Sequence, residues 1–190
     1  IERLIEKYFN SVILKTYKSL KPYACKSDLA RLCILYLYGG WYVDVSLKWQ
    51  YKNPEYLTNN KIELIVFRDI PKSSRTSWAC ANALIFSNPF HPVLEEAINK
   101  IVKNYQNKYY GLNALFCTGP VVLGSALATI GINEKVIIGD FIESTPNYKI
   151  KNFLFLLPSG KILAEWKSHT NGGRLIETPG NKGTHDYNKF

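Results

Sequence analysis

The chain has 190 residues, 46% hydrophobic and 14% aromatic, with a formal net charge of +9. This size and composition predict one globular domain with a substantial core and exclude a disordered chain. No apolar run approaches the roughly 18 residues of a membrane-spanning helix. The positive charge favours nucleic acid, an anionic membrane face or a phosphorylated small molecule as partner, or reflects only a lysine-rich coding bias. No run of five basic residues occurs.

The four cysteines form no CxxC pair, so their spacing argues against a zinc site. We expect free, buried thiols in a reducing compartment. This predicts a cytoplasmic protein, either free or at the inner face of a membrane. The cysteines are Cys25, Cys33, Cys80 and Cys117.

In the first half of the chain, apolar spacing and turn residues predict an amphipathic helix followed by a helix, a strand and further strands. Ser27 is expected to cap the second helix, and Gly39-Gly40 to end it. The expected order is helix 1–20, helix 27–38, strand 41–47, loop 52–61, strand 62–67, loop 68–77 and a strand within 79–87.

In the second half, proline follows a cap-like residue at two predicted helix starts, His91-Pro92 and Gly119-Pro120. The expected elements are helix 91–105, loop 104–111, a helix from 118, and strands 136–142 and 153–157. The tail from Lys161 reads as a short strand with a loop over a ligand, or as a flexible end. Helices and strands that alternate in this way predict an α/β domain with a mixed sheet.

Acidic and basic residues gather around the predicted 41–47 strand. Asp28 and Arg31 are three apart, so they share one helix face. They form either a local ion pair at the helix start or a site in which Asp28 accepts sugar hydroxyls beside the Arg31 charge. Asp44 ends an apolar run, where a carboxylate must be solvated, paired or bound to a cation. Magnesium and manganese prefer such oxygen ligands, and Ser46 adds only a neutral hydroxyl.

The segment KSDLARLCILYLYGGWYVDVS resembles the sugar-binding region of DXD-containing glycosyltransferases. That group includes Golgi-type α-mannosyltransferases, bacterial capsule and lipopolysaccharide sugar transferases, and glucosylating toxin domains. The family pattern is S-D-x-x-R, an apolar helix, then Y-G-G-x-Y-x-D-x-D. The matching residues are Ser27, Asp28, Arg31, Tyr38, Gly39, Gly40, Tyr42 and Asp44.

Two later segments are similar to the same family and follow in the family's order. The first runs from Asn82 to His91-Pro92, and the second is Thr118-Gly119-Pro120. His169, Asn171 and His185 are candidates for a C-terminal polar motif that closes over the diphosphate. The resemblance covers about residues 26–127.

The chain departs from the family pattern in two places. Ser46 stands where the family has its second motif aspartate, which argues against tight metal binding. About 25 residues precede the motif, so we expect an N-terminal nucleotide-binding segment to be missing from residues 1–190.

The resemblance implies a nucleotide-sugar transferase of the type A fold, with a Rossmann-like mixed sheet flanked by helices. It implies transfer from a nucleoside diphosphate sugar to an acceptor hydroxyl, with retention, and a glycan or lipid-linked acceptor. Mn²⁺ or Mg²⁺ would be held by Asp44 and Ser46, and no residue stands out as general base or nucleophile. The implied donor site comprises Asp28, Arg31, Gly39, Gly40, Tyr42, Asp44, Asn82, Thr118 and Gly119.

Two alternatives remain at this stage. One is a non-catalytic sugar- or nucleotide-binding domain of the same fold, which Ser46 and the short N-terminal segment favour. The other is a basic nucleic-acid binder, which rests on charge alone and lacks any motif, so we expect no nucleic-acid partner.

Overall fold

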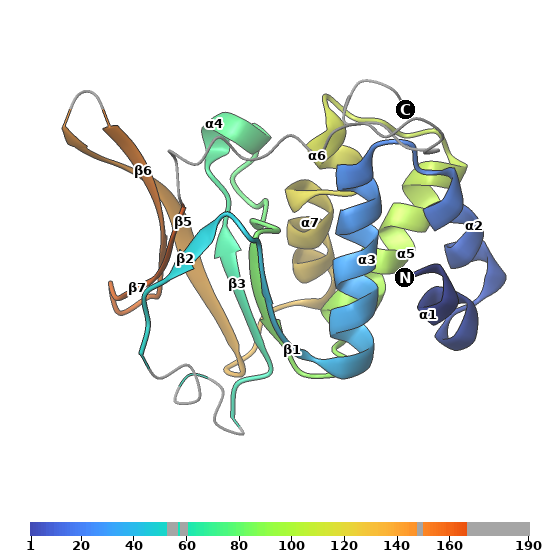
Figure 1. Cartoon of the computed structure of the whole chain (residues 1–190), viewed down its shortest axis with the longest axis horizontal. Helices are drawn as coiled ribbons and strands as arrows, with labels where there is room; N and C mark the ends of the chain where they lie inside the picture. Colours follow the sequence, from blue (N-terminus) through green and yellow to red (C-terminus); the bar gives the residue numbers. More distant parts are fainter. Residues whose placement is uncertain (53–56, 58–60, 148–149, 167–190) are drawn as a thin grey trace.

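A mixed sheet is the framework of the protein, as a computed structural model shows (Figure 1). The structure describes residues 1–52, 57, 61–147 and 150–166. The strand order is β1-β4-β3-β5-β6-β7-β2, in which β3 and β5 pair in parallel and the other neighbours pair antiparallel. The strands are β1 (Gly40–Val43), β2 (Leu47–Trp49), β3 (Leu64–Arg68), β4 (Leu84–Ser87), β5 (Val136–Asn147), β6 (Ile150–Leu156) and β7 (Ile162–Trp166).

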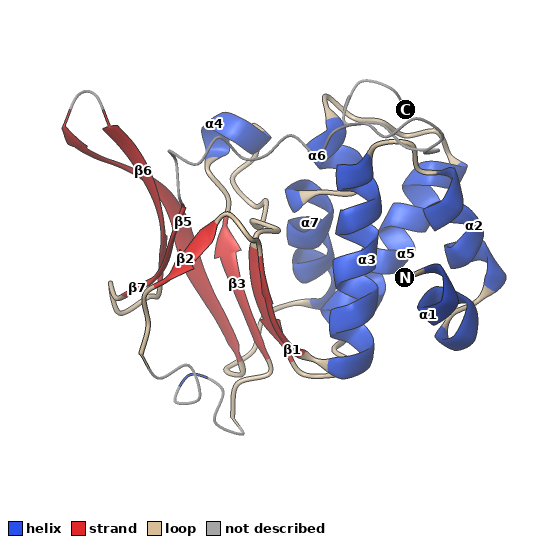
Figure 2. Ribbon diagram, viewed as in Figure 1, coloured by secondary structure: helices blue, strands red, loops and turns tan. Residues whose placement is uncertain are grey.

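The longer helices gather on one side of the sheet (Figure 2). The α/β class with a mixed sheet is therefore confirmed. The helices are α1 (Glu2–Tyr8), α2 (Ser11–Ser19), α3 (Tyr23–Tyr38), α4 (Pro71–Ser74), α5 (Pro92–Gln106), α6 (Ala114–Cys117) and α7 (Pro120–Ile130). Among them, none is long and apolar enough to cross a membrane.

The single helix predicted over 1–20 is wrong, because the chain breaks between α1 and α2. The Asn10 side chain accepts hydrogen bonds from the backbone N–H groups of Val12 and Ile13, at 3.1 and 3.0 Å. Asn10 therefore caps a new helix, as asparagine commonly does. The apolar spacing carries across the break, so periodicity alone could not reveal it.

The predicted start of the next helix is also wrong, since α3 begins at Tyr23, directly after Pro22. Ser27 lies inside the helix, and its carbonyl oxygen accepts a hydrogen bond from Arg31 Nε at 3.2 Å. The predicted end is confirmed: Gly39 follows α3 with a φ of +65°, a conformation that glycine adopts without strain.

The predicted 41–47 strand is in fact two strands at opposite ends of the sheet order. β1 pairs with β4, and β2 pairs with β7. Asp44, Val45 and Ser46 make the turn between them. The ring of Trp41 on β1 nevertheless contacts the ring of Trp49 on β2, with centroids 5.1 Å apart. The sheet is therefore strongly curved, so that its two edge strands approach each other.

The curl gives the sheet two cores, one on each face. Along β3, Leu64 and Val66 pack with the helices, whereas Ile65 and Phe67 face a second cluster that includes β6 and β7 residues. Phe67 meets Phe155 edge to face with ring centroids 5.2 Å apart. Helices thus cover one face, and the curled sheet fills much of the other with its own side chains.

Several smaller elements complete the comparison with the sequence. The short helices α4 and α6 lie in segments read as loop or left unassigned, and β5 extends beyond its predicted end at Ile142. Strand β7 confirms the short strand expected in the tail. Helix α5 begins after His91, whose Nδ1 accepts a hydrogen bond from the Val93 N–H at 3.3 Å.

Candidate functional site

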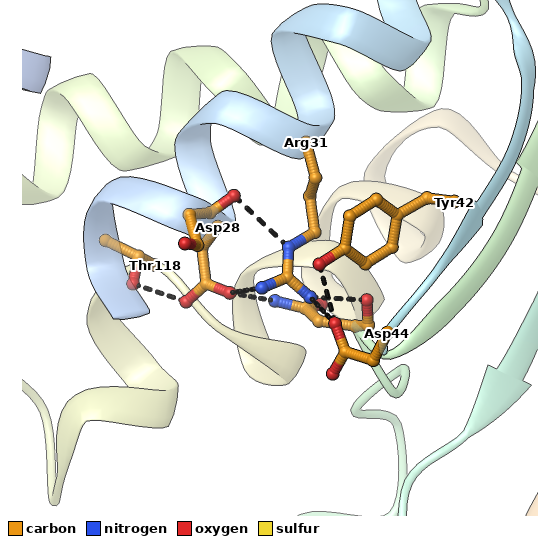
Figure 3. Close-up of polar contacts among 7 residues, drawn as sticks. Asp28, Arg31, Tyr42, Asp44 and Thr118 are labelled. Atoms are coloured by element: carbon orange, nitrogen blue, oxygen red, sulfur yellow. Dashed lines mark hydrogen bonds and ion pairs between the residues drawn. The ribbon is translucent and has the colours of Figure 1, made fainter. Parts of the chain in front are cut away.

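The candidate site lies where α3 begins and β1 ends. Asp28 is in the early turns of α3, and Asp44 follows β1, which runs back along that helix. Figure 3 shows the two carboxylates on either side of the Arg31 guanidinium. The loop before β4 and the turn before α7 supply Asn82 and Thr118. Four segments far apart in sequence therefore meet at one point.

Arg31 is the centre of this cluster, and only 8% of its surface is exposed. Nη2 lies 3.2 Å from Asp28 Oδ1, and Nη1 lies 3.6 Å from Asp44 Oδ1. Nη1 also donates a hydrogen bond to the Asn82 carbonyl oxygen at 2.6 Å. The guanidinium carbon sits 4.5 Å from the ring centroid of Tyr42, a cation–π geometry. Arg31 thus ties helix α3 to both β1 and the loop before β4.

The Asp28 carboxylate has a partner for each oxygen. Oδ1 accepts a hydrogen bond from Asn82 Nδ2 at 3.0 Å, and Oδ2 accepts one from Thr118 Oγ1 at 2.8 Å. Burial raises the pKa of Asp28 above its ordinary value of 3.8, although Arg31, Asn82 and Thr118 favour the charged form. The side chain keeps 13% exposure, so one edge remains accessible.

Asp44 is the more open carboxylate, with a side-chain exposure of 26%. Its Oδ1 accepts a hydrogen bond from the Tyr42 hydroxyl at 2.6 Å. Burial raises the pKa of Tyr42, and the neighbouring Asp44 carboxylate adds to this effect. Tyr42 therefore stays protonated and acts as a hydrogen-bond donor that orients Asp44.

Asn82 is buried and carries one unsatisfied atom. Its backbone carbonyl oxygen accepts a hydrogen bond from Arg31, and its side-chain Nδ2 donates one to Asp28. Its side-chain Oδ1 has no hydrogen-bond partner among the described residues. A buried acceptor without a partner costs about 1–3 kcal/mol. A donor that arrives with a ligand or a water would relieve that cost.

The structure brings together six of the predicted site residues and separates others. Gly39 and Gly40 lie at the far end of α3, about 16 Å from Asp28 at 1.5 Å per residue. At Gly39 a Cβ would lie 2.6 Å from Pro89 Cδ, so close packing explains this glycine. Gly119 precedes α7 next to Thr118. The six residues in direct contact are Asp28, Arg31, Tyr42, Asp44, Asn82 and Thr118.

The residues around Asp44 fit a weak cation site better than a tight one. Ser46 lies in the same turn and offers a neutral hydroxyl, while the Arg31 cation is only 3.6 Å from Asp44 Oδ1. Within the described ranges, no group of three acidic, histidine or cysteine side chains could hold a metal. Tight divalent sites need more carboxylate oxygens than this. His169, Asn171 and His185 lie outside the described residues.

One buried acid was missed by the sequence reading. Asp69 directly follows β3 and is 8% exposed, and burial raises the pKa of its carboxyl. The exposed pair formed by Arg68 and Asp140, 2.7 Å apart, lies next to it, with Arg68 at the end of β3 and Asp140 within β5. The signal was available, because Asp69 follows an apolar strand just as Asp44 does.

A family model and two known proteins resemble parts of this chain. Residues 1–63 match the family model described as "Glycosyltransferase sugar-binding region containing DXD motif". This match covers about a third of the chain, and it makes residues 1–63 similar to the sugar-binding region of DXD-containing glycosyltransferases. The matched segment contains α1 to β2, and therefore both carboxylates and the arginine of the cluster. Asn82 and Thr118 lie beyond it.

Two further relatives carry glycosyltransferase names. The Saccharomyces cerevisiae protein named "Putative glycosyltransferase HOC1" is 31% identical over 120 residues, which are 54% of this chain and 29% of HOC1. The solved structure "PaToxG Glycosyltransferase" is 24% identical, with a TM-score of 0.41, and the match covers 57% of this chain and 35% of that one. The chain thus spans about a third of the length of these two proteins.

Proposed function

We propose that this chain is the donor-sugar-binding part of a glycosyltransferase that uses a nucleoside diphosphate sugar. The observation that carries the proposal is the Asp28–Arg31–Asp44 cluster, completed by Asn82 and Thr118. Carboxylates accept hydrogen bonds and cannot donate them when ionised. Two such acceptors at one partly open point suit the neutral hydroxyls of a sugar.

The cluster is also preorganised, which supports a binding role. Arg31 holds both carboxylates, and Tyr42 and Thr118 each fix one carboxylate oxygen. Side chains fixed in this way lose little freedom when a ligand arrives.

For the reaction, we propose transfer with retention on a type A nucleotide-sugar transferase fold. The bond between the anomeric carbon and the diphosphate oxygen breaks, and a bond from that carbon to the acceptor oxygen forms. The acceptor proton passes to the departing nucleoside diphosphate. Asp28 and Asp44 are both engaged by Arg31, which favours a positioning role for them over that of a covalent nucleophile.

Metal use is a separate part of the proposal. Asp44 would supply one oxygen ligand to Mn²⁺ or Mg²⁺, with Ser46, waters and diphosphate oxygens around it. When bound, such an ion would offset charge on the leaving diphosphate. The weak donor set described above makes us expect low intrinsic metal affinity. The acceptor is a glycan or a lipid-linked sugar, and the net charge of +9 would favour contact with an anionic membrane face.

Calorimetric titration with UDP- and GDP-sugars, with and without Mn²⁺, tests the proposal, and CMP-sugars serve as the nucleoside monophosphate comparison. We expect one nucleotide class to bind and Asp44→Ala to weaken that binding at least ten-fold. Asp140→Ala is the matched control, because it removes an exposed carboxylate that pairs with Arg68 outside the cluster. Equal affinity of Asp44→Ala and Asp140→Ala for the donor would contradict the assignment of Asp44.

The second candidate is a non-catalytic sugar- or nucleotide-binding domain of the same fold. Ser46 favours it, because the second motif carboxylate is replaced by a hydroxyl. It predicts donor binding without donor hydrolysis, even with Mn²⁺ present. Release of free sugar from the bound donor, measured on the same chain, separates the two candidates.

A further inference from the structure

A cavity of about 240 Å³ opens between α5, α6, α7 and the segment before β4. Three aromatic side chains contribute to its wall, together with an amide, a hydroxyl and a lysine. None of these residues belongs to the acid cluster. The wall residues that carry the argument are Trp78, Tyr109, Phe116, Asn104, Ser125 and Lys100.

We propose that this cavity binds one sugar ring of the acceptor. An aromatic face packs against the apolar C–H face of a pyranose, while amide and hydroxyl groups meet its hydroxyls. Binding pockets of this kind combine apolar walls with a few placed polar groups. Trp78 and Tyr109 are 52% and 48% exposed, which leaves large aromatic surfaces open to a ligand.

Size and charge distinguish this ligand from the donor. Pockets for drug-sized ligands measure about 300–1,000 Å³, so 240 Å³ suits a single ring rather than a whole nucleotide sugar. Lys100 Nζ lies 3.3 Å from Glu96 Oε1, so its charge is already offset. The cavity therefore favours a neutral saccharide over a diphosphate.

Contacts with backbone atoms fix the position of the residues that form the cavity wall. A Cβ at Gly124 would overlap the Trp78 carbonyl oxygen and lie 2.9 Å from Ala79 Cα, so this segment packs directly on α7. Asn104 Nδ2 donates hydrogen bonds to the Phe116 and Cys117 carbonyl oxygens, at 3.4 and 3.0 Å.

Phe116 precedes Thr118 by two residues, so their Cα atoms are at most about 7.6 Å apart. Thr118 in turn contacts Asp28. One wall residue of the cavity therefore lies close to Thr118, which contacts a carboxylate of the proposed donor site. The role of the cavity as an acceptor site rests on the proposed function, whereas its capacity to bind a sugar does not.

The test measures saccharide binding without donor. Methyl glycosides of glucose, galactose, mannose and N-acetylglucosamine, with their disaccharides, are titrated by saturation-transfer NMR. We expect at least one to bind, and Trp78→Ala and Tyr109→Ala each to weaken it at least five-fold. Tyr8→Ala is the matched control, because Tyr8 on α1 is also 48% exposed and lies outside the cavity.

Asp44→Ala separates this proposal from the donor site. Glycoside binding that is lost in Asp44→Ala and kept in Trp78→Ala would overturn the cavity assignment, as would no binding of any glycoside. If donor titration fails while glycoside binding persists with the expected variant pattern, the sugar-binding cavity stands and the transferase function fails. Heat denaturation of each variant identifies any loss of binding that follows from unfolding.

Discussion

Replacing Arg31 with methionine is expected to cost far more stability than replacing any exposed arginine. The change keeps a long side chain but removes the cation between Asp28 and Asp44, whose side chains are 13% and 26% exposed. Removing one partner of a buried ion pair costs about 3–5 kcal/mol. The Asn82 carbonyl also loses its 2.6 Å hydrogen bond. Because the partly exposed Asp44 carboxylate can still be hydrated, we expect a total loss of about 3–4 kcal/mol in the free energy of unfolding.

Urea unfolding followed by tryptophan fluorescence measures this loss, with heat denaturation as a second readout. About 2–4 °C per kcal/mol is usual for chains of this length, so the midpoint should fall on the order of 10 °C. Arg68→Met is the matched control. Arg68 pairs with Asp140 at 2.7 Å, but their side chains are 60% and 40% exposed, so we expect less than about 1 kcal/mol.

The pH dependence gives the same variant a second test. Without Arg31 the pKa of Asp28 should rise further, because the guanidinium favours the charged carboxylate. An acid with a raised pKa in the folded state binds its proton more tightly there than in the unfolded chain. The folded protein is therefore destabilised at pH values where the acid must ionise, and this destabilisation disappears as the pH falls and the acid is protonated. The deficit of Arg31→Met should therefore shrink as the pH falls from 7 toward the ordinary pKa of an aspartate. Equal deficits for Arg31→Met and Arg68→Met at pH 7 would refute the buried-cluster reasoning.

Three further predictions concern other parts of the protein. Burial lowers the pKa of His91, so stability should fall as pH drops below about 6.5. His91→Asn, which can still cap α5, should show a flatter pH profile in urea unfolding; an unchanged profile would exclude His91 as the cause. Gly124→Ala should cost roughly 1–3 kcal/mol by overpacking against the Trp78 backbone, and an unshifted melting temperature would contradict this. Burial raises the pKa of the four cysteines to about 11 or 12, so iodoacetamide should label them only after denaturation; rapid labelling of the folded chain would contradict their burial.

The local part of the site could be predicted from the sequence. Residues three apart on a helix share a face whatever surrounds them, and Asp28 and Arg31 do meet at 3.2 Å. Gly39 was correctly predicted as the helix stop for the same local reason. The missed cap at Asn10 was also a local signal, overlooked because the apolar pattern continues past it.

The long-range part could not be predicted from spacing. Asn82 and Thr118 reach Asp28 across 54 and 90 residues, and no local periodicity encodes such contacts. The family resemblance alone brought these residues into the predicted site. The prediction of a single strand over 41–47 failed for the same reason, because β1 and β2 pair with different partners far along the chain.

The charge of the cluster indicates which end of the proposed donor it would meet. Asp28 and Asp44 against Arg31 leave two negative charges and one positive, which disfavours a phosphate at this point. The sugar hydroxyls should lie beside Asp28, and the diphosphate charge must be offset by groups other than Asp28 and Arg31, such as the cation proposed at Asp44. Asp28→Asn should then weaken binding of the whole nucleotide sugar but leave that of the free nucleoside diphosphate unchanged. Tighter binding of the free diphosphate in that variant would instead place the phosphates beside Asp28.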